Sequence, residues 1–104
     1  PMKLSRNESA SVERRLIKYL TQACEAAKFE IDGFVWLDHV VDYADYPRSL
    51  QVSWAFATVE QRDRAASGPV LARIREFTDI ALTDAGVPLE QVADPLRLIH
   101  ERQG

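Results

Sequence analysis

The hydrophobic periodicity of this chain changes once, at Asp32-Gly33, from a helical repeat to a strand repeat. Before the change, apolar residues recur every three or four positions between residues 7 and 28, which is the spacing of one helix face: Val12, Leu16, Tyr19, Leu20, Ala23, Cys24 and Ala27. Ser5 and Glu8 have the spacing of a capping box, and two later serines are alternative caps. This pattern predicts one long amphipathic helix.

Beyond Gly33 the chain alternates with a period of two residues, as strands do. Two such runs, 34–43 and 50–56, are joined by the segment 44–48, in which Pro47 fixes one backbone angle. Because strands with so short a connection pair antiparallel, we expect a long hairpin. The more continuously apolar parity of each run is predicted to face the core: Val35, Leu37, His39, Val41 and Tyr43, then Leu50, Val52, Trp54 and Phe56.

The opposite face of this hairpin is expected to carry an apolar strip of its own. In the predicted register His39 lies opposite Trp54. Phe34, Trp36 and Val40 then point away from the helices. An exposed strip of this kind on a small protein usually marks a surface for a partner. A register with Trp36 inside would remove the strip, and the residues leave both registers open.

The second half of the chain predicts further helices and one more strand. Thr58 and Gln61 have capping-box spacing for a short helix, and Pro69 suits the first turn of the helix that follows. An apolar stripe marks that second helix: Val70, Leu71, Ile74, Phe77, Thr78, Ala81 and Ala85. Gly86 is the expected left-handed cap, and the segment 96–101 is interpreted as a third strand.

The predicted order is helix, strand, strand, helix, strand, which defines an α+β domain. A three-stranded sheet that contains the antiparallel hairpin, with the helices packed on one face, buries each apolar face. The length of 104 residues suits a single domain. Pro1 precedes Met2, so we expect the natural chain to begin at Met2 and assign the domain to residues 2–104.

Composition excludes several classes of protein. The hydrophobic content of 46% argues against disorder, and no apolar run approaches the roughly 20 residues that span a membrane. Cys24 is the one cysteine, which excludes an internal disulfide and a multi-cysteine metal site, and its place on the helical stripe favours a structural role. The net charge of -3 disfavours general nucleic-acid binding. The segment after Met2 is too polar for a signal peptide, so we expect a cytoplasmic location.

His39 is the first residue to consider for catalysis. Its nearest carboxylates in sequence, Asp38 and Asp42, point to the opposite face of the strand. They are also about 13 Å apart, too far to share a proton or a metal ion. A half-buried histidine packed on an aromatic ring is the simpler interpretation, and His100 is a weaker candidate. We therefore predict no catalytic residue, no metal site and no cofactor.

The segment 42–48 is the most distinctive stretch of the chain. It combines aromatic residues and arginine, the residue types that dominate binding surfaces. The predicted interaction surface consists of Tyr43, Asp45, Tyr46 and Arg48, together with Trp36. In the alternative interpretation, Tyr43 closes the core, Asp45 caps the turn and Arg48 pairs with a carboxylate.

Charge is unevenly distributed along the chain. Residues 2–28 carry six basic and three acidic side chains, whereas residues 29–58 carry five acidic side chains and one basic one. A solvated helix face explains this excess. The alternative is a basic patch of Arg14, Arg15 and Lys18 that contacts RNA or phosphate, beside an acidic hairpin that would oppose it.

The run from Gly33 to Val52 resembles a group of small uncharacterised gammaproteobacterial proteins. They share the pattern F-x-W-L-x-H-x-V-x-Y-x-x-[FY]-P-x-S-L-x-V after one amphipathic helix, and this chain matches it from Phe34 onward. Some members carry the automated label "Fis family transcriptional regulator". The residues here do not support that label, because a helix-turn-helix needs two short helices joined by a tight turn, and Pro88 and Pro95 interrupt the last third of the chain.

Three functions follow as expectations, in order of preference. The first is a non-catalytic protein-interaction domain, in its simplest form a homodimer that associates through the free face of the sheet. The second is an RNA- or ribosome-associated factor, because the element order is also that of several small nucleic-acid-binding modules, including a ribosome-maturation-factor domain. The third is an enzyme centred on His39. No membrane partner is expected.

Overall fold

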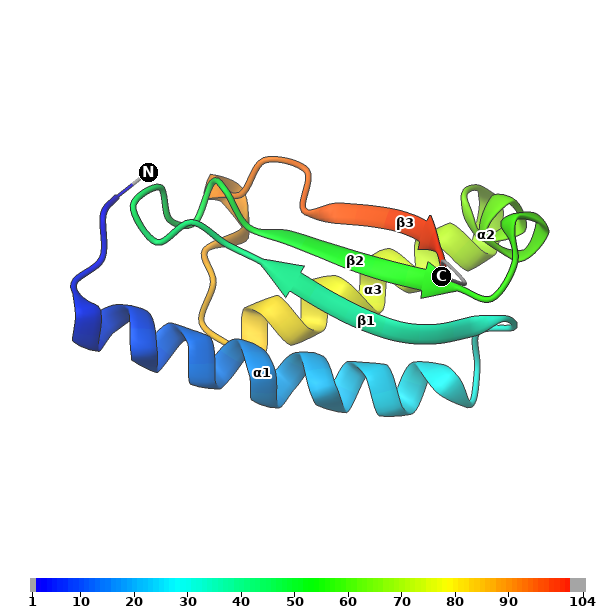
Figure 1. Cartoon of the computed structure of the whole chain (residues 1–104), viewed down its shortest axis with the longest axis horizontal. Helices are drawn as coiled ribbons and strands as arrows, with labels where there is room; N and C mark the ends of the chain where they lie inside the picture. Colours follow the sequence, from blue (N-terminus) through cyan, green and yellow to red (C-terminus); the bar gives the residue numbers. More distant parts are fainter. Residues whose placement is uncertain (1, 102–104) are drawn as a thin grey trace.

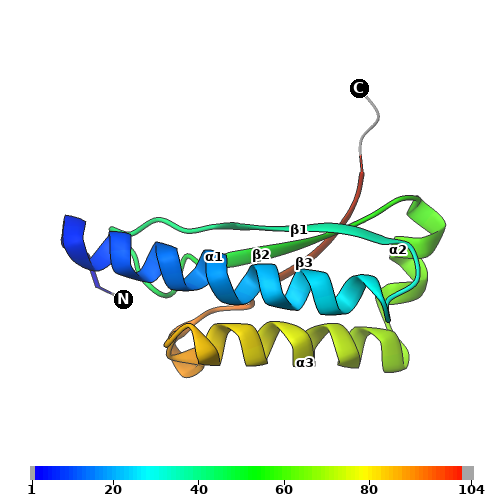
Figure 2. The same ribbon diagram turned by 90° about the horizontal axis from the view of Figure 1, so that it is seen from below.

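The helices and the sheet form two layers, which are seen edge-on in Figure 2. The computed structural model describes residues 2–101, so the last three residues of the domain predicted over 2–104 lie outside the described range. Its elements are α1 (Arg6–Lys28), β1 (Phe34–Val40), β2 (Gln51–Phe56), α2 (Val59–Ala65), α3 (Gly68–Asp84), the 3-10 turn η1 (Leu89–Gln91) and β3 (Leu96–His100) (Figure 1). The predicted α+β class and the order α-β-β-α-β are confirmed, and the third strand exists.

The sheet is mixed, with strand order β1-β2-β3. β1 and β2 form the predicted antiparallel hairpin, whereas β2 and β3 run parallel. Parallel neighbours need a long crossover connection, which α2, α3 and η1 supply here. Helices α1 and α3 lie side by side beneath one face of the sheet, as predicted, and the short α2 lies at the end where β2 finishes (Figures 1 and 2).

Helix α1 begins with the predicted capping box. The Ser5 backbone N–H donates to Glu8 Oε1 at 2.8 Å, and the Glu8 backbone N–H donates to Ser5 Oγ at 3.1 Å. The buried face of the helix follows the predicted stripe: Val12, Leu16, Leu20, Ala23 and Ala27. Arg15 crosses to the neighbouring helix, where its Nε donates to the Ala85 carbonyl at 2.8 Å. This bond joins α1 to the carbonyl end of α3.

Strand β2 supplies the centre of the core. Its predicted inward parity is confirmed, because Leu50, Val52, Trp54 and Phe56 are all buried. The Trp54 indole N–H donates to Thr78 Oγ1 at 3.0 Å, and the Thr78 hydroxyl donates to the Ile74 carbonyl at 2.8 Å. A buried indole N–H without an acceptor would destabilise the fold, so this pair fixes the contact between β2 and α3.

The register of the hairpin differs from the prediction by two residues. His39 pairs with Val52, and Leu37 takes the predicted place opposite Trp54. The cause is the position of the turn, whose centre lies one residue nearer to β1 than predicted. The connection spans residues 41–50 and is also longer than the predicted segment 44–48. The predicted core parity of β1 is correct nevertheless, because Leu37 and His39 are half-buried beneath the sheet.

A register shift between Phe34 and Trp36 corrects the predicted apolar strip. The irregularity turns Phe34 into the core, where it is 8% exposed and its ring lies 4.7 Å from that of Trp54. The strip therefore lacks Phe34, contrary to the prediction. Trp36 remains on the outer face, which excludes the alternative register with Trp36 inside.

Gly33 occupies the turn between α1 and β1, with a φ of 81°. A Cβ at this position would lie 2.4 Å from Cδ of Gln61, the residue whose backbone N–H donates to Thr58 Oγ1 and so helps to begin α2. Both the left-handed backbone and the close approach require glycine. The glycine therefore allows the start of β1 to lie directly against Gln61 of α2.

Replacing Thr78 with valine is expected to lower the free energy of unfolding by about 1–3 kcal/mol, because the Trp54 indole N–H would stay buried without an acceptor. The same substitution in a Trp54→Phe background should cost much less, since no indole N–H remains. Urea denaturation of the four proteins in this double-mutant cycle measures the difference. Equal costs in both backgrounds would contradict the assigned role of the bond.

Gly33→Ala is expected to destabilise the fold by about 1–3 kcal/mol, through backbone strain and the clash with Gln61. Gly68→Ala is the matched control, because Gly68 also has a positive φ but a Cβ there meets no atom within 4 Å. Thermal unfolding should therefore show the larger loss for Gly33→Ala. A larger loss for the Gly68 variant would show that the Gln61 contact is unimportant.

Candidate functional site

One face of the sheet has no helix against it among residues 2–101 (Figure 2). We call it the open face. The strand register arranges its side chains in three rows that run across the strands. The rows are Trp36–Ala55–Ile99, Asp38–Ser53–Arg97 and Val40–Gln51. Trp36 is 36% exposed and Val40 is 65% exposed, so the face combines apolar and charged groups.

Asp38 and Arg97 occupy opposite ends of the middle row. They are separated by two strand spacings, or about 10 Å between Cα atoms, which is too far for a direct ion pair. Within residues 2–101 neither side chain has an ion-pair partner. Arg97 Nη1 donates to Gln51 Oε1 at 3.1 Å, and Asp38 Oδ1 accepts from the His39 backbone N–H at 2.8 Å. Both charges remain exposed at the two edges of the sheet.

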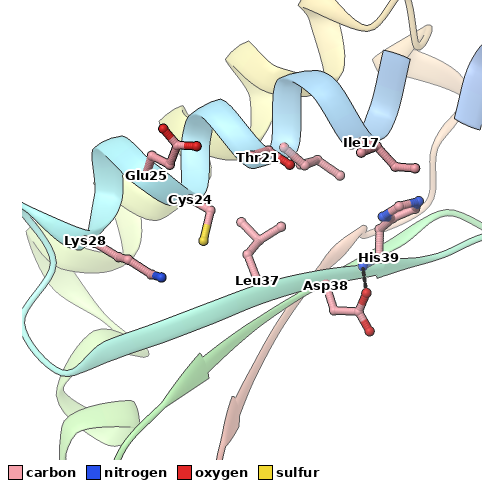
Figure 3. A pocket seen from close by; sticks show the side chains of 9 residues that line it. Ile17, Thr21, Cys24, Glu25, Lys28, Leu37, Asp38 and His39 are labelled. Atoms are coloured by element: carbon pink, nitrogen blue, oxygen red, sulfur yellow. Dashed lines mark hydrogen bonds between the residues drawn. The ribbon is translucent and has the colours of Figure 1, made fainter. Parts of the chain in front are cut away.

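A groove of about 410 Å³ lies between α1 and β1, on the other side of the sheet (Figure 3). It is lined by residues of both elements: Ile17, Leu20, Thr21, Cys24, Glu25, Lys28, Leu37, Asp38 and His39. The side chain of Asp38 itself points away from α1, to the open face (Figure 3). Cys24 and His39 lie toward opposite ends of the groove, with Leu37 between them (Figure 3). Cys24 is half-buried on the apolar side of α1.

His39 belongs to a three-residue cluster with Glu13 and Tyr43. Its Nε2 lies 3.0 Å from Glu13 Oε2, and the Tyr43 hydroxyl donates to Glu13 Oε1 at 2.5 Å. Glu13 was not among the predicted site residues. Its sequence signal is weak, because it lies beside Val12 at the margin of the apolar stripe and its partners come from residues far along the chain. The cluster ties α1 to the end of the hairpin.

The cluster shifts the acidity of two of its members. Burial works to raise the pKa of Glu13, but the hydrogen bonds from Tyr43 and His39 and the attraction of His39 outweigh it, so the pKa lies below its usual value. Burial, followed by the Glu13 carboxylate, raises the pKa of Tyr43 well above its usual value. Glu13 is therefore ionised and Tyr43 neutral near pH 7.

The groove brings no nucleophile to this cluster. Cys24 follows Glu13 by eleven residues on one helix, which is about 16 Å at 1.5 Å per residue. Leu37 lies between Cys24 and His39 in the groove, and no hydrogen bond joins the thiol to the imidazole among residues 2–101, so the two do not form a nucleophile–base pair here (Figure 3). Among the described residues, His, Cys, Asp and Glu side chains form no group of three that could hold a metal ion.

The loop before β2 corrects part of the predicted interaction surface. Tyr46 is 5% exposed, because its backbone N–H and C=O bond to Met2 at 2.8 and 2.7 Å, and the N-terminal segment packs over it. Tyr43 is half-buried through its contact with Glu13, so the two aromatic side chains of the loop are not free. The alternative interpretation of Tyr43 as a residue that closes the core describes the structure better.

The charged residues of the same loop form hydrogen bonds and an ion pair within the loop. Arg48 donates to Asp45 through Nη2 at 2.8 Å and Nε at 3.2 Å, and this hydrogen-bonded carboxylate raises the pKa of the guanidinium. In the alternative interpretation of this loop, the pairing of Arg48 with a carboxylate is borne out, but Asp45 does not cap the turn. Asp42 does so instead, since its Oδ1 accepts from the Ala44 backbone N–H at 2.9 Å.

The predicted basic patch is reduced to two residues. Arg14 and Lys18 are exposed on α1. Arg15 is half-buried, and its guanidinium donates to Ser11 Oγ and the Ala85 carbonyl. Its charge is therefore directed toward α3 instead of the solvent.

The Glu13 cluster makes stability depend on pH on the acid side. Because the folded-state pKa of Glu13 is lowered, its contribution is present above the ordinary carboxyl pKa and is lost as pH falls through the folded value. The stability advantage of the wild type over Glu13→Gln should therefore shrink between about pH 5 and pH 3. Urea denaturation at several pH values measures this, with Glu25→Gln, exposed on the same helix, as control. An advantage that does not change with pH would contradict the assignment.

No protein-family model matches this chain, and no match was found among curated proteins or solved structures. The resemblance of the hairpin to the gammaproteobacterial group stays a prediction. Among residues 2–101, none of the helices combines the length and the apolar character that crossing a membrane requires. The candidate functional site is therefore identified from the geometry of the fold alone, and we choose the open face.

Proposed function

We propose that this protein is a non-catalytic protein-interaction domain that acts in the cytoplasm and binds its partner through the open face. The observation that carries the proposal is the exposure of Trp36 and Val40 on a sheet face that no described helix covers. Tryptophan and arginine are the side chains most enriched among the energetically dominant residues of interfaces, and the open face holds one of each.

The other exposed apolar side chains do not gather into a comparable surface. They are spread over several elements: Met2 before α1, Ile17 on α1, Phe29 directly after it, Val59 on α2, and Val70 and Ile80 on α3. Single apolar residues of this kind are common on protein surfaces and need no partner. On the open face, by contrast, the register places Trp36, Ala55 and Ile99 next to one another in a single row.

The alternative functions have weaker support. Catalysis at His39 has weak support, because the Nε2 atom of the imidazole is directed to Glu13 and Leu37 lies between His39 and Cys24 (Figure 3). An RNA- or ribosome-associated role would use the basic patch, of which Arg15 is engaged within the fold. The two exposed cations that remain in the patch, Arg14 and Lys18, provide little of the phosphate neutralisation that nucleic-acid binding requires.

A photo-crosslinking amino acid in place of Val40 should capture a protein in the cells that produce this chain, because Val40 is exposed on the open face. Adding Trp36→Glu should reduce the adduct at least about tenfold, since a charge would replace a dominant contact residue. The matched control places the crosslinker at Ile80, which is similarly exposed on α3.

Adducts formed equally from Ile80, or unaffected by Trp36→Glu, would refute the proposal. An adduct that disappears on ribonuclease treatment would refute it in favour of the RNA-associated alternative. Thermal unfolding of each variant shows whether the fold is retained, which is expected because Trp36 and Val40 lie outside the core.

A further inference from the structure

We infer that the partner of the open face is a second copy of this chain, packed sheet to sheet around a twofold axis that runs along β2. The inference rests on the proposed function and names the partner of the same surface. It follows from the way in which the three strands distribute apolar and charged groups across the rows of the open face.

A twofold axis parallel to β2 exchanges the two edge strands and keeps each row opposite itself. β1 of one chain then lies over β3 of the other and runs antiparallel to it, while the two copies of β2 run in the same direction. The strand axes of the two sheets stay aligned, as in aligned packing of two sheets. In the first row Trp36 faces the partner's Ile99. Ala55 lies at the centre, where it is fully covered by its own chain, and the two larger side chains flank it. The row is therefore complementary to its own rotated copy.

The charges of the middle row also match those of a rotated second copy. The same rotation places Asp38 over the partner's Arg97, and it does so twice, once at each edge of the sheet. Within one chain these two charges are about 10 Å apart and cannot neutralise each other directly. Packed sheets are also about 10 Å apart, a gap that an aspartate and an arginine can bridge from opposite sides.

The charges also exclude the other face-to-face arrangement. A twofold axis across the strands, through the middle row, would place β1 over β1 and β3 over β3. Asp38 would then face the partner's Asp38, and Arg97 would face the partner's Arg97. Like charges opposite each other are costly at an interface. The order aspartate, serine, arginine across the row thus selects the axis along β2.

The size of the face sets the expected strength of the dimer. Three strands about 4.8 Å apart, of five to seven residues at about 3.3 Å per residue, make a patch of roughly 14 by 20 Å. Stable complexes bury about 800 Å² on each partner, which is about three times this geometric area. The dimer is therefore weak, with a Kd of about 10 µM or more, and it dissociates readily.

Charge reversal tests this geometry directly. Asp38→Arg alone and Arg97→Asp alone should each raise the dimer Kd at least about tenfold, because each places like charges opposite one another. An equimolar mixture of the two variants should recover dimers within about threefold of the wild-type Kd, since both ion pairs re-form in the heterodimer, one of them with reversed polarity. The double variant should recover homodimers for the same reason.

Sedimentation equilibrium between about 1 µM and 1 mM measures these constants, a range that brackets the expected Kd. Asp79→Arg, on the exposed side of α3, is the matched control and should leave the Kd unchanged. Should a single variant fail to fold, the wild-type Kd at rising salt provides the test, because two ion pairs predict weaker association between about 0.05 and 0.5 M NaCl.

A strict monomer at 1 mM overturns the inference, because even weak interfaces associate at that protein concentration. So does a dimer that neither charge reversal nor salt weakens, or a mixture that shows no recovery. If the chain is monomeric while Val40 still crosslinks another protein in a Trp36-dependent way, the inference fails and the proposed function stands. If both results are negative, both fail.

Discussion

Burial of β2 is the constraint on which the rest of the structure depends. The strand has a neighbour on each edge and helices beneath it, and its Trp54 is fully buried against Phe34 and Phe77, with ring centroids 4.7 and 6.1 Å away. The Trp54 indole N–H requires an acceptor, and Thr78 on α3 provides it. Because side chains alternate along a strand, placing Trp54 inward forces Ser53 and Ala55 outward. The open face is thus a consequence of how the core is filled.

Local patterns predicted most of the elements, because caps and periodicity depend on residues close in sequence. Ser5 with Glu8 marked the start of α1, Gly86 the end of α3, and the alternation from Leu50 to Phe56 the inward face of β2. The direction of β3 was not predictable in this way. It is set by the crossover through α2 and α3, which returns the chain to the edge of β2 that the hairpin leaves free.

Features that depend on long-range contacts were missed or predicted incorrectly. The two-residue error in register arose because nothing near His39 in sequence determines where the chain turns back toward β2. The shift that buries Phe34 and the contact of Glu13 with the hairpin likewise join residues from different elements. Of the predicted interaction surface, the strand residue Trp36 is the aromatic side chain that remains exposed, because Tyr46 packs beneath the N-terminal segment.

The same distinction applies to charge. Several of the charged groups that are unevenly distributed in the sequence are engaged by contacts within the fold. Arg15 donates to the Ala85 carbonyl at the end of α3, Arg48 pairs with Asp45, and Glu13 accepts a hydrogen bond from Tyr43. Asp38 and Arg97 differ, since they stand at the two edges of one sheet face without ion-pair partners among residues 2–101. The polar row Asp38–Ser53–Arg97, which lies beside the apolar row, keeps the open face hydrated in the monomer. Because its two charges are opposite in sign, the same row also determines how a partner must be oriented on that face. An interface of this kind gains specificity from charge and only modest affinity from area, which suits reversible association.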